Sequence, residues 1–184
     1  MTADKTLALT IRDATHEDLA AITAIYADEV TSGTATFEVV APDLEEMTAR
    51  FDALRKDGFP YIVAVSGGEV LGYAYAGPYH KRAAYRFTLE DSIYIAREAR
   101  GMGVGRKLLQ ALIAACEDGG WRQMIAIISN SGTGAASIGL HKSLGFSDAG
   151  LLRDVGYKSG EWRDITLMQR TLGVGANEPP PEGR

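Results

Sequence analysis

Three glycines at alternate positions, Gly101, Gly103 and Gly105, follow an apolar run that ends at Ile95. Glycine has no Cβ, so successive backbone N–H groups can converge on an anion. A helix that opens directly after such a loop adds unpaired N–H groups and about half a unit of positive charge. Arg100, just before the glycines, could supply a full charge. The segment therefore suits a diphosphate group.

Other uses of such a loop have to be weighed against this one. Glycines between a strand and a helix can form only a tight turn, and on this segment alone that alternative stays open. The spacing is not Gly-x-x-x-x-Gly-Lys-Ser/Thr, which argues against a nucleoside triphosphatase. A dinucleotide-binding loop follows the first strand of its unit, whereas this one comes after about four strands.

Glu90 and His141 could carry proton transfer. Glu90 lies on the strand immediately before the glycines, among mostly apolar neighbours, so its pKa should be raised and it could act as a base. A salt-bridged surface glutamate is the alternative. Asp91 should point to the opposite face of the strand and is the weaker candidate. His141, on a short helix further on, could donate or relay a proton, or could be only structural.

Metal and thiol chemistry find little support in the sequence. The histidines are His16, His80 and His141, and no two of them share a metal-ligand spacing, so no metal site is expected. Cys116 is the only cysteine and falls on the apolar face of a predicted helix. We expect it to be a buried structural thiol.

Hydrophobic periodicity predicts a layered domain in which strands and helices alternate in the order β-α-α-β-β-β-α-β-α-β-β. Strands are predicted at 7–11, 61–65, 70–75, 88–95 and 124–128, with two more within 146–169. Helices are predicted after a capping box at Thr15 and Asp18, from about Pro42 to Leu54, at 103–117 and at 135–144. Gly67-Gly68 and Lys158-Ser159-Gly160 predict tight turns. Residues 1–172 form one domain, and 173–184, with three consecutive prolines, are expected to be a disordered tail.

Composition excludes several classes of protein. The chain has 184 residues, 46% hydrophobic and 23% charged, and a net charge of −5, as in ordinary globular proteins. There is no run of five or more like charges to attract nucleic acid or a membrane surface. No apolar stretch reaches the roughly 18–20 residues that cross a bilayer, and residues 1–6 do not resemble a secretory signal. We therefore expect a cytoplasmic protein.

The glycine loop is similar to a known signature. Arg100-x-x-Gly103-x-Gly105 after an apolar strand resembles the acetyl-CoA motif of the GCN5-related N-acetyltransferases (GNAT), and the order of elements resembles their fold. Further matches resemble the phosphinothricin and methionine sulfoximine N-acetyltransferases and extend over nearly the whole chain. They are Thr36-Phe37, Ala76-Gly77-Pro78, Arg82, Ala84-Tyr85, Thr88, Glu90, Ser92, Tyr94, Ser137, His141, Leu144-Gly145-Phe146 and the segment 156–164.

This resemblance implies an α/β (α+β) fold of GNAT type, with a mixed, mostly antiparallel central sheet of about seven strands flanked by about four helices. It implies acetyl-CoA as co-substrate, Glu90 as the general base, and His141 in place of the tyrosine that protonates the departing thiolate in many members. The implied cofactor-binding residues are Ser92, Ile93, Tyr94, Ile95, Arg100, Gly101, Met102, Gly103, Val104, Gly105 and Ser137.

An amino-acid-like acceptor needs cations and hydrogen-bond donors. Arg82, Tyr85 and Thr88 lie just ahead of Glu90, and an arginine can hold a carboxylate or phosphinate through two parallel hydrogen bonds. A solvated surface charge is the alternative for Arg82. Phe37 could close the apolar side of the acceptor pocket.

The chain departs from the subfamily pattern at Gly134, where an asparagine usually contacts the cofactor. Asn130 could reach the same point if the loop folds back, or backbone groups could replace the contact. The asparagine contact is therefore assigned to no residue of this chain.

The resemblance, together with these features, implies an N-acetyltransferase that acetylates the primary amine of a small molecule of the phosphinothricin, methionine sulfoximine or methionine sulfone type, by direct attack on the thioester. The alternatives are another amine or a protein N-terminus as acceptor, or a non-catalytic acyl-CoA-binding sensor. The last strand and Trp162 could form a homodimer interface, and a core position for Trp162 is equally compatible with the sequence.

Overall fold

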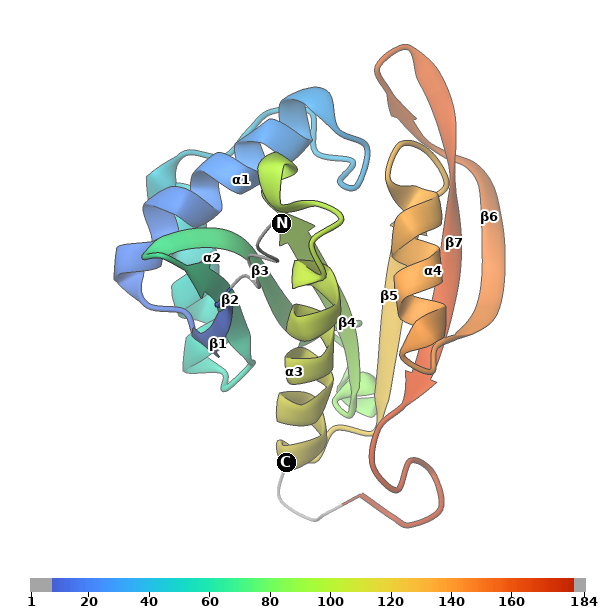
Figure 1. The fold of residues 1–184 in the computed structure, drawn as a ribbon. Helices are drawn as coiled ribbons and strands as arrows, with labels where there is room; N and C mark the ends of the chain where they lie inside the picture. The colour runs from blue at the N-terminus through green and yellow to red at the C-terminus, as the bar shows by residue number, and fades with distance from the viewer. Residues whose placement is uncertain (1–7, 181–184) are drawn as a thin grey trace, which may run out of the picture.

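The computed structural model describes residues 8–180, and the fold lies within them as a single seven-stranded sheet with helices on both faces (Figure 1). The strands are β1 (Thr10–Asp13), β2 (Tyr61–Ser66), β3 (Glu69–Pro78), β4 (Thr88–Ile95), β5 (Gln123–Ser129), β6 (Ser147–Lys158) and β7 (Glu161–Thr171). The helices are α1 (Leu19–Ser32), α2 (Leu44–Lys56), α3 (Val104–Asp118) and α4 (Gly134–Ser143). Three single 3₁₀ turns precede α1, β4 and α3: η1 (His16–Asp18), η2 (Ala83–Tyr85) and η3 (Arg97–Ala99).

The sheet has the order β1-β2-β3-β4-β5-β7-β6, and every neighbouring pair is antiparallel except β4 and β5. The seven strands and four α-helices predicted from the sequence are therefore confirmed. The first strand begins later than predicted, at Thr10 rather than at position 7, which lies outside the described residues. The capping box of Thr15 and Asp18 is present ahead of α1.

Both predicted tight turns are formed. Gly67 and Gly68 have φ angles of 59° and 88° and join β2 to β3 with Ser66 opposite Glu69. Two positive φ angles in a two-residue loop match the right-handed twist of the flanking strands. Ser159 and Gly160 make the same kind of turn between β6 and β7, with φ angles of 56° and 80°.

Two hydrophobic clusters lie on opposite faces of the sheet, because successive strand residues alternate between the faces. On β2, Ile62 and Ala64 pack with the apolar face of α3, whereas Tyr61 and Val63 pack with α1 and α2. Cys116 lies fully buried in the α3 cluster, as predicted. The sheet is thereby fixed from both sides, which gives the functional side chains a rigid support.

The parallel pair β4 and β5 is joined over only three residues. Its last pair is Glu90 with Ile125, although β4 continues to Ile95 and β5 to Ser129. Beyond Glu90 the two strands separate, and β5 pairs on its other side with β7. The upper half of β4 therefore has backbone groups that no strand partner takes on the β5 side, where a ligand could use them.

No helix in residues 8–180 is long and apolar enough to cross a membrane. Residues 173–180 contain neither helix nor strand, and 181–184 lie outside the described residues. The domain limit at 172 and the disordered tail stay predictions.

Candidate active site

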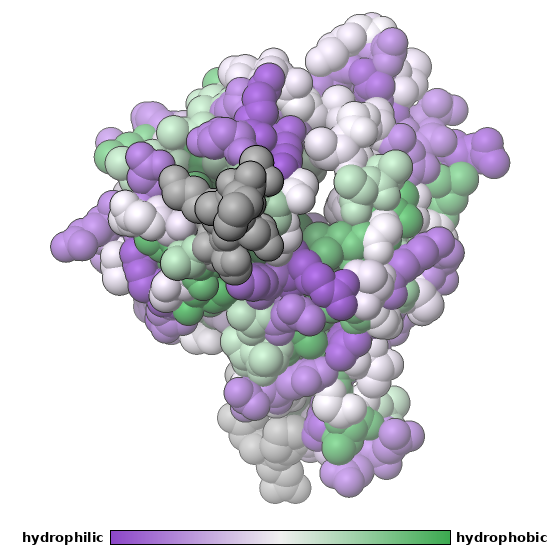
Figure 2. Space-filling model, viewed as in Figure 1, coloured by the Kyte–Doolittle hydropathy of each residue, from purple (hydrophilic) through white to green (hydrophobic). Residues whose placement is uncertain are grey.

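A pocket of about 240 Å³ opens where β4 and β5 separate. Figure 2 shows the surface hollowed between the lobe that carries α1 and the lobe formed by α4, β6 and β7. Its wall combines β4, β5, one face of α4 with the residue before it, one residue of β7 and the segment after α1. Predicted site residues brought together here are Phe37, Glu90, Ser92, Ile93, Tyr94, Ser137 and His141.

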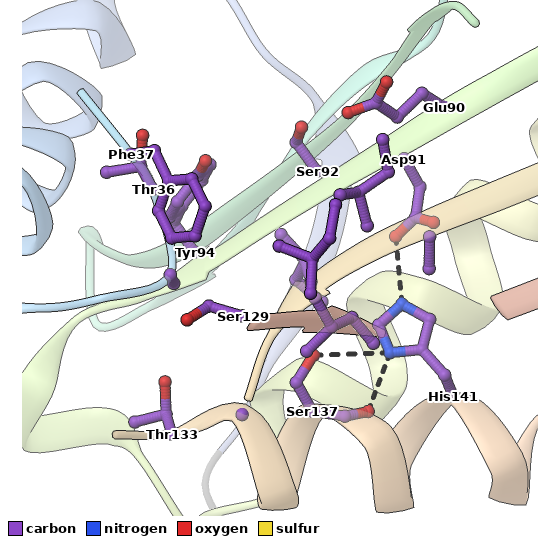
Figure 3. Close-up of a pocket in the computed structure, with 17 residues that line it drawn as sticks. Thr36, Phe37, Glu90, Asp91, Ser92, Tyr94, Ser129, Thr133, Ser137 and His141 are labelled. Atoms are coloured by element: carbon purple, nitrogen blue, oxygen red, sulfur yellow. Dashed lines mark hydrogen bonds and ion pairs between the residues drawn. The ribbon is translucent and has the colours of Figure 1, made fainter. Parts of the chain in front are cut away.

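Glu90 stands at the apex of the splay, as the last β4 residue paired with β5. Its side chain and that of Ser92 lie on the same side of β4 as Phe37 (Figure 3). Burial raises the pKa of Glu90 above its usual 4.5, and the neighbouring charge of Asp91 raises it further. A carboxylate with a raised pKa is a better proton acceptor at neutral pH than an exposed glutamate, which is what a general base requires.

His141 lies on the other side of β4 and points from α4 toward Asp91 (Figure 3). Nε2 is 3.0 Å from Oδ2 of Asp91, and Nδ1 is 2.7 Å from the carbonyl oxygen of Ser137. Phe146 presses against the ring at a centroid distance of 4.9 Å. Burial lowers the pKa of His141, but the hydrogen bond and charge of Asp91, with the Ser137 carbonyl, outweigh burial and raise it. The predicted opposite orientations of Glu90 and Asp91 are confirmed.

The glycine loop lies at the N-terminus of α3, as the sequence predicts. Gly101 and Gly103 have φ angles of 78° and 80°, a region that favours glycine, and Gly103 is the N-cap of the helix. A Cβ on either residue would meet nothing within 4 Å, so the space above this loop is open to a ligand. Gly105 lies against α4, with a would-be Cβ 3.3 Å from Leu140. The loop thus has room and unpaired N–H groups for a diphosphate.

The guanidinium of Arg100 is already engaged in hydrogen bonds within the protein. Its guanidinium donates to Glu29 of α1 at 2.9 Å and to the carbonyl oxygen of Ile95 at 3.3 Å. The loop residues from Arg100 to Gly105, with Ile95, lie at the end of β4 and are not part of the pocket wall. They would meet a different part of the cofactor from the residues at the apex of the splay.

A short segment, residues 33–37, closes the pocket on the α1 side, and we call it the strap. Oε1 of Glu29 accepts a hydrogen bond from the backbone of Ala35 at 2.8 Å, while Oε2 of the same carboxylate receives Arg100. The hydroxyl of Thr34 donates to the carbonyl of Ser131 at 3.0 Å. The strap is therefore fixed to α1, to the cofactor loop and to the segment before α4 at once.

The hairpin of β6 and β7 holds the strap from the opposite side. Lys158 is buried and donates to the carbonyl oxygen of Thr36 at 2.7 Å. The ring of Phe37 lies on Gly156, so close that a Cβ there would be 2.2 Å from it. Burial lowers the pKa of the Lys158 amine. The sequence places Lys158 in a tight turn and in the segment 156–164, but nothing in its neighbourhood along the chain indicates that its amine is buried against α1 and the strap.

Three residues predicted to bind the acceptor lie elsewhere. Arg82 and Tyr85 belong to the turn before β4, and Tyr85 packs edge-on against Tyr79 and His80 at 5.8 and 5.0 Å. Thr88 is in strand pairing with Gln123. None of the three lines the pocket of its own chain. The three residues are close to Glu90 in sequence but do not reach the pocket. The reason is that η2 lies at the end of β4 where β4 and β5 are still paired, whereas the pocket opens where they separate.

The departure at Gly134 has a steric reason. A Cβ at this position would lie 1.9 Å from the carbonyl oxygen of Ser129, so the loop conformation leaves no space for any side chain. The side-chain oxygen of Asn130 accepts a hydrogen bond from Thr166 of β7 at 2.5 Å, and Asn130 is not part of the pocket wall. Ser129, Thr133 and Gly134 themselves line the pocket at this corner.

The family follows from a comparison with known domains. Residues 11–167 match the model of the acetyltransferase (GNAT) domain. The chain belongs to the GNAT family of acetyltransferases.

Individual relatives show which acetyltransferases the chain is similar to. The chain is 55% identical to the phosphinothricin N-acetyltransferase of Alcaligenes faecalis over 173 residues, 94% of this chain and 87% of the relative. It is 43% identical to the L-methionine sulfoximine/L-methionine sulfone acetyltransferase of Pseudomonas paraeruginosa, over 90% of this chain and 96% of the relative. The crystal structure of a phosphinothricin acetyltransferase from Sinorhizobium meliloti in complex with acetyl-CoA superposes with a TM-score of 0.92 at 47% identity, covering 95% and 94% of the two chains. This protein is an acetyl-CoA-dependent N-acetyltransferase, with acetyl-CoA as its co-substrate.

Proposed function

We propose that this enzyme acetylates the primary amine of a small amino-acid-like molecule of the phosphinothricin, methionine sulfoximine or methionine sulfone type, with Glu90 as the general base. The observation that carries the proposal is the position of Glu90 at the apex of the splay, in a chain similar along nearly its whole length to acetyltransferases of those molecules. The strap encloses the pocket from above, which favours a small acceptor over a protein N-terminus.

The proposed reaction begins with proton removal, because a primary amine is mostly protonated at neutral pH. Glu90 accepts that proton directly or through a water molecule, and the amine nitrogen then attacks the thioester carbonyl. The backbone of β4 beyond Glu90, free of β5, is available to hold the carbonyl oxygen and the amide groups of the co-substrate. When the carbon–sulfur bond breaks, its electron pair goes to sulfur, which takes up a proton to leave as the thiol.

We also propose a homodimer through β6 and β7. Trp162 and Tyr157 pack edge-on at 5.3 Å, yet they are 63% and 60% exposed. The core position considered for Trp162 is therefore wrong, and the exposed aromatic pair supports an interface. Sedimentation velocity tests it: we expect a dimer for the native chain and a shift toward monomer for Trp162→Glu, whereas a native monomer would contradict it. The cytoplasmic location stays a prediction.

A coupled free-thiol assay over a panel of acceptors tests the function. The panel contains phosphinothricin, methionine sulfoximine, methionine sulfone, ordinary amino acids and a peptide with a free N-terminus. We expect turnover with the first three, and loss of turnover with retained acetyl-CoA binding in Glu90→Gln. Preference for the peptide would reject the small acceptor. Acetyl-CoA binding without transfer to any amine would indicate the sensor instead.

A further inference from the structure

Asp91 and His141 form an ion pair inside the protein, next to the proposed reaction centre. The carboxylate and the imidazole are each 2% exposed, and Oδ2 and Nε2 are 3.0 Å apart. Asp91 comes from β4 and His141 from α4, fifty positions later in the chain. Both residues also line the pocket (Figure 3).

The hydrogen bonds of His141 determine how many protons the ring carries. Nδ1 is 2.7 Å from the carbonyl oxygen of Ser137, which can only accept, and 3.4 Å from the hydroxyl of the same residue, which can accept as well. The shorter contact favours a hydrogen on Nδ1. Nε2 faces the carboxylate of Asp91, which also accepts when it is ionised. The arrangement is satisfied by a ring with hydrogens on both nitrogens, which is the positively charged imidazolium.

The other charged groups on the elements packed around His141 are directed elsewhere. On α4, Lys142 pairs with Asp148, and on α3, Arg106 donates to the hydroxyl of Ser143. Arg170 of β7 bonds the carbonyl oxygen of Leu144 and pairs with Glu117 of α3. The side chain of Glu90 lies on the face of β4 opposite to that of Asp91 (Figure 3). Among the described residues, Asp91 is thus the charged side chain in contact with the ring.

The dependence is mutual. Oδ1, the second carboxylate oxygen of Asp91, has no hydrogen-bond partner within residues 8–180. Within the same residues, the side chain of Asp91 therefore depends on His141 for its hydrogen bond. A buried carboxylate without a compensating positive charge would be strongly disfavoured. Each partner therefore favours the charged state of the other.

We propose that Asp91 is a positioning residue that keeps His141 doubly protonated and fixes its ring in the pocket wall, so that His141 holds a positive charge beside the reaction centre and cannot accept a proton from the amine. An imidazolium has no lone pair with which to take the proton of the amine. The base of the reaction is then Glu90 alone, on the opposite face of the same strand. The catalytic part of this inference rests on the proposed function, whereas the charge state of the ring does not.

The charge state can be measured in the free enzyme. Nitrogen NMR shifts of the imidazole side chains distinguish a doubly protonated ring from either neutral tautomer, and the chain has only three histidines to assign. We expect His141 to be doubly protonated at neutral pH in the native chain. A neutral ring at neutral pH would overturn the proposal, without need of any variant.

Asp91→Asn isolates the contribution of the carboxylate. Removing an opposite charge at hydrogen-bond distance should move the titration midpoint of His141 to lower pH by about one unit or more. Asp52→Asn is the matched control, because Asp52 pairs with His16 at 2.8 Å on the exposed surface and should leave the His141 titration as it is in the native chain. An unchanged His141 midpoint in folded Asp91→Asn would overturn the inference.

Activity supplies a second readout that a merely structural role would not change. Protonated His141 is lost as pH rises, so the alkaline fall of kcat should move to lower pH in Asp91→Asn and return toward the native position in Asp91→Glu. If Asp91 only supports the fold, Asp91→Asn lowers thermal stability and leaves the pH profile in place, which contradicts the proposal. If no small amine is acetylated, the proposed function fails, and the NMR titration still decides the ion pair.

Discussion

The contact between Phe37 and Gly156 makes the strap sensitive to a single methyl group. A Cβ at position 156 would lie 2.2, 2.4 and 2.8 Å from three carbons of the Phe37 ring, whereas ordinary contacts begin at 3.4 Å. In Gly156→Ala the ring must therefore retreat by about 1.2 Å or turn away from β6. Because Phe37 lines the pocket, this movement changes the roof of the proposed acceptor site.

The magnitude follows from the cost of overpacking. Inserting a methyl group into a packed site costs typically about 1–3 kcal/mol, and the lower end applies here because Phe37 is 36% exposed and can relax toward solvent. A loss of about 1.4 kcal/mol in acceptor binding is about tenfold in affinity. We expect the acceptor KM to rise about tenfold, and acetyl-CoA affinity to stay unchanged because the glycine loop lies at the end of β4.

Steady-state kinetics with varied acceptor, together with calorimetric titration of acetyl-CoA, measure the two effects separately. Gly150→Ala is the matched control on the same strand, since its Cβ would meet only Leu167 at 3.8 Å. Phe37→Ala tests the contact itself: in that background, Gly156→Ala should have no further effect on KM. An unchanged KM in Gly156→Ala, or an equal rise in both backgrounds, would refute the reasoning.

Three further predictions concern the base, the glycine loop and the strap. Below its raised pKa Glu90 is protonated and cannot act as a base, so kcat/KM should fall as pH decreases through a midpoint above 4.5. Glu90→Gln should lower turnover by about 10²–10⁴, and full activity of this variant at neutral pH would contradict the assignment. Gly103→Val places a β-branched residue at a φ of 80° and should weaken acetyl-CoA binding at least several-fold by calorimetry, with equal affinity counting against the diphosphate site. Glu29→Gln keeps the acceptor for Ala35 but loses the charge that pairs with Arg100, so the unfolding midpoint should fall by about 2–4 °C for about 1 kcal/mol, and an unchanged midpoint in scanning calorimetry would show that the pair adds nothing.

Local signals in the sequence predicted the fold well. Turn glycines, helix caps and the two periodicities are short-range features, and they placed all seven strands and four helices. Strand alternation likewise correctly predicted that the side chains of Glu90 and Asp91 lie on opposite faces of β4. The glycine loop carried a local conformational requirement that the positive φ angles of Gly101 and Gly103 confirm.

The remaining parts of the site depend on contacts between distant segments. The pairing of Asp91 with His141 and that of Lys158 with the strap join residues that no periodicity relates. Arg82 lies outside the pocket of its own chain for the converse reason, because residues that are close along the chain are separated in space by η2. Side-chain chemistry suggests what a residue can do, and the tertiary contact decides whether it does so.

The position of β7 has a consequence for the biosynthesis of the enzyme. The last strand within the described residues is not at an edge of the sheet but between β5 and β6, so the site wall is completed only after β7 has been synthesised. Until Thr171 has emerged, β5 presents an open edge to solvent, which is a template for wrong pairing with other chains. Partial chains are therefore expected to depend on protection from aggregation, and a truncation that removes β7 should prevent formation of the active site rather than merely trim the domain.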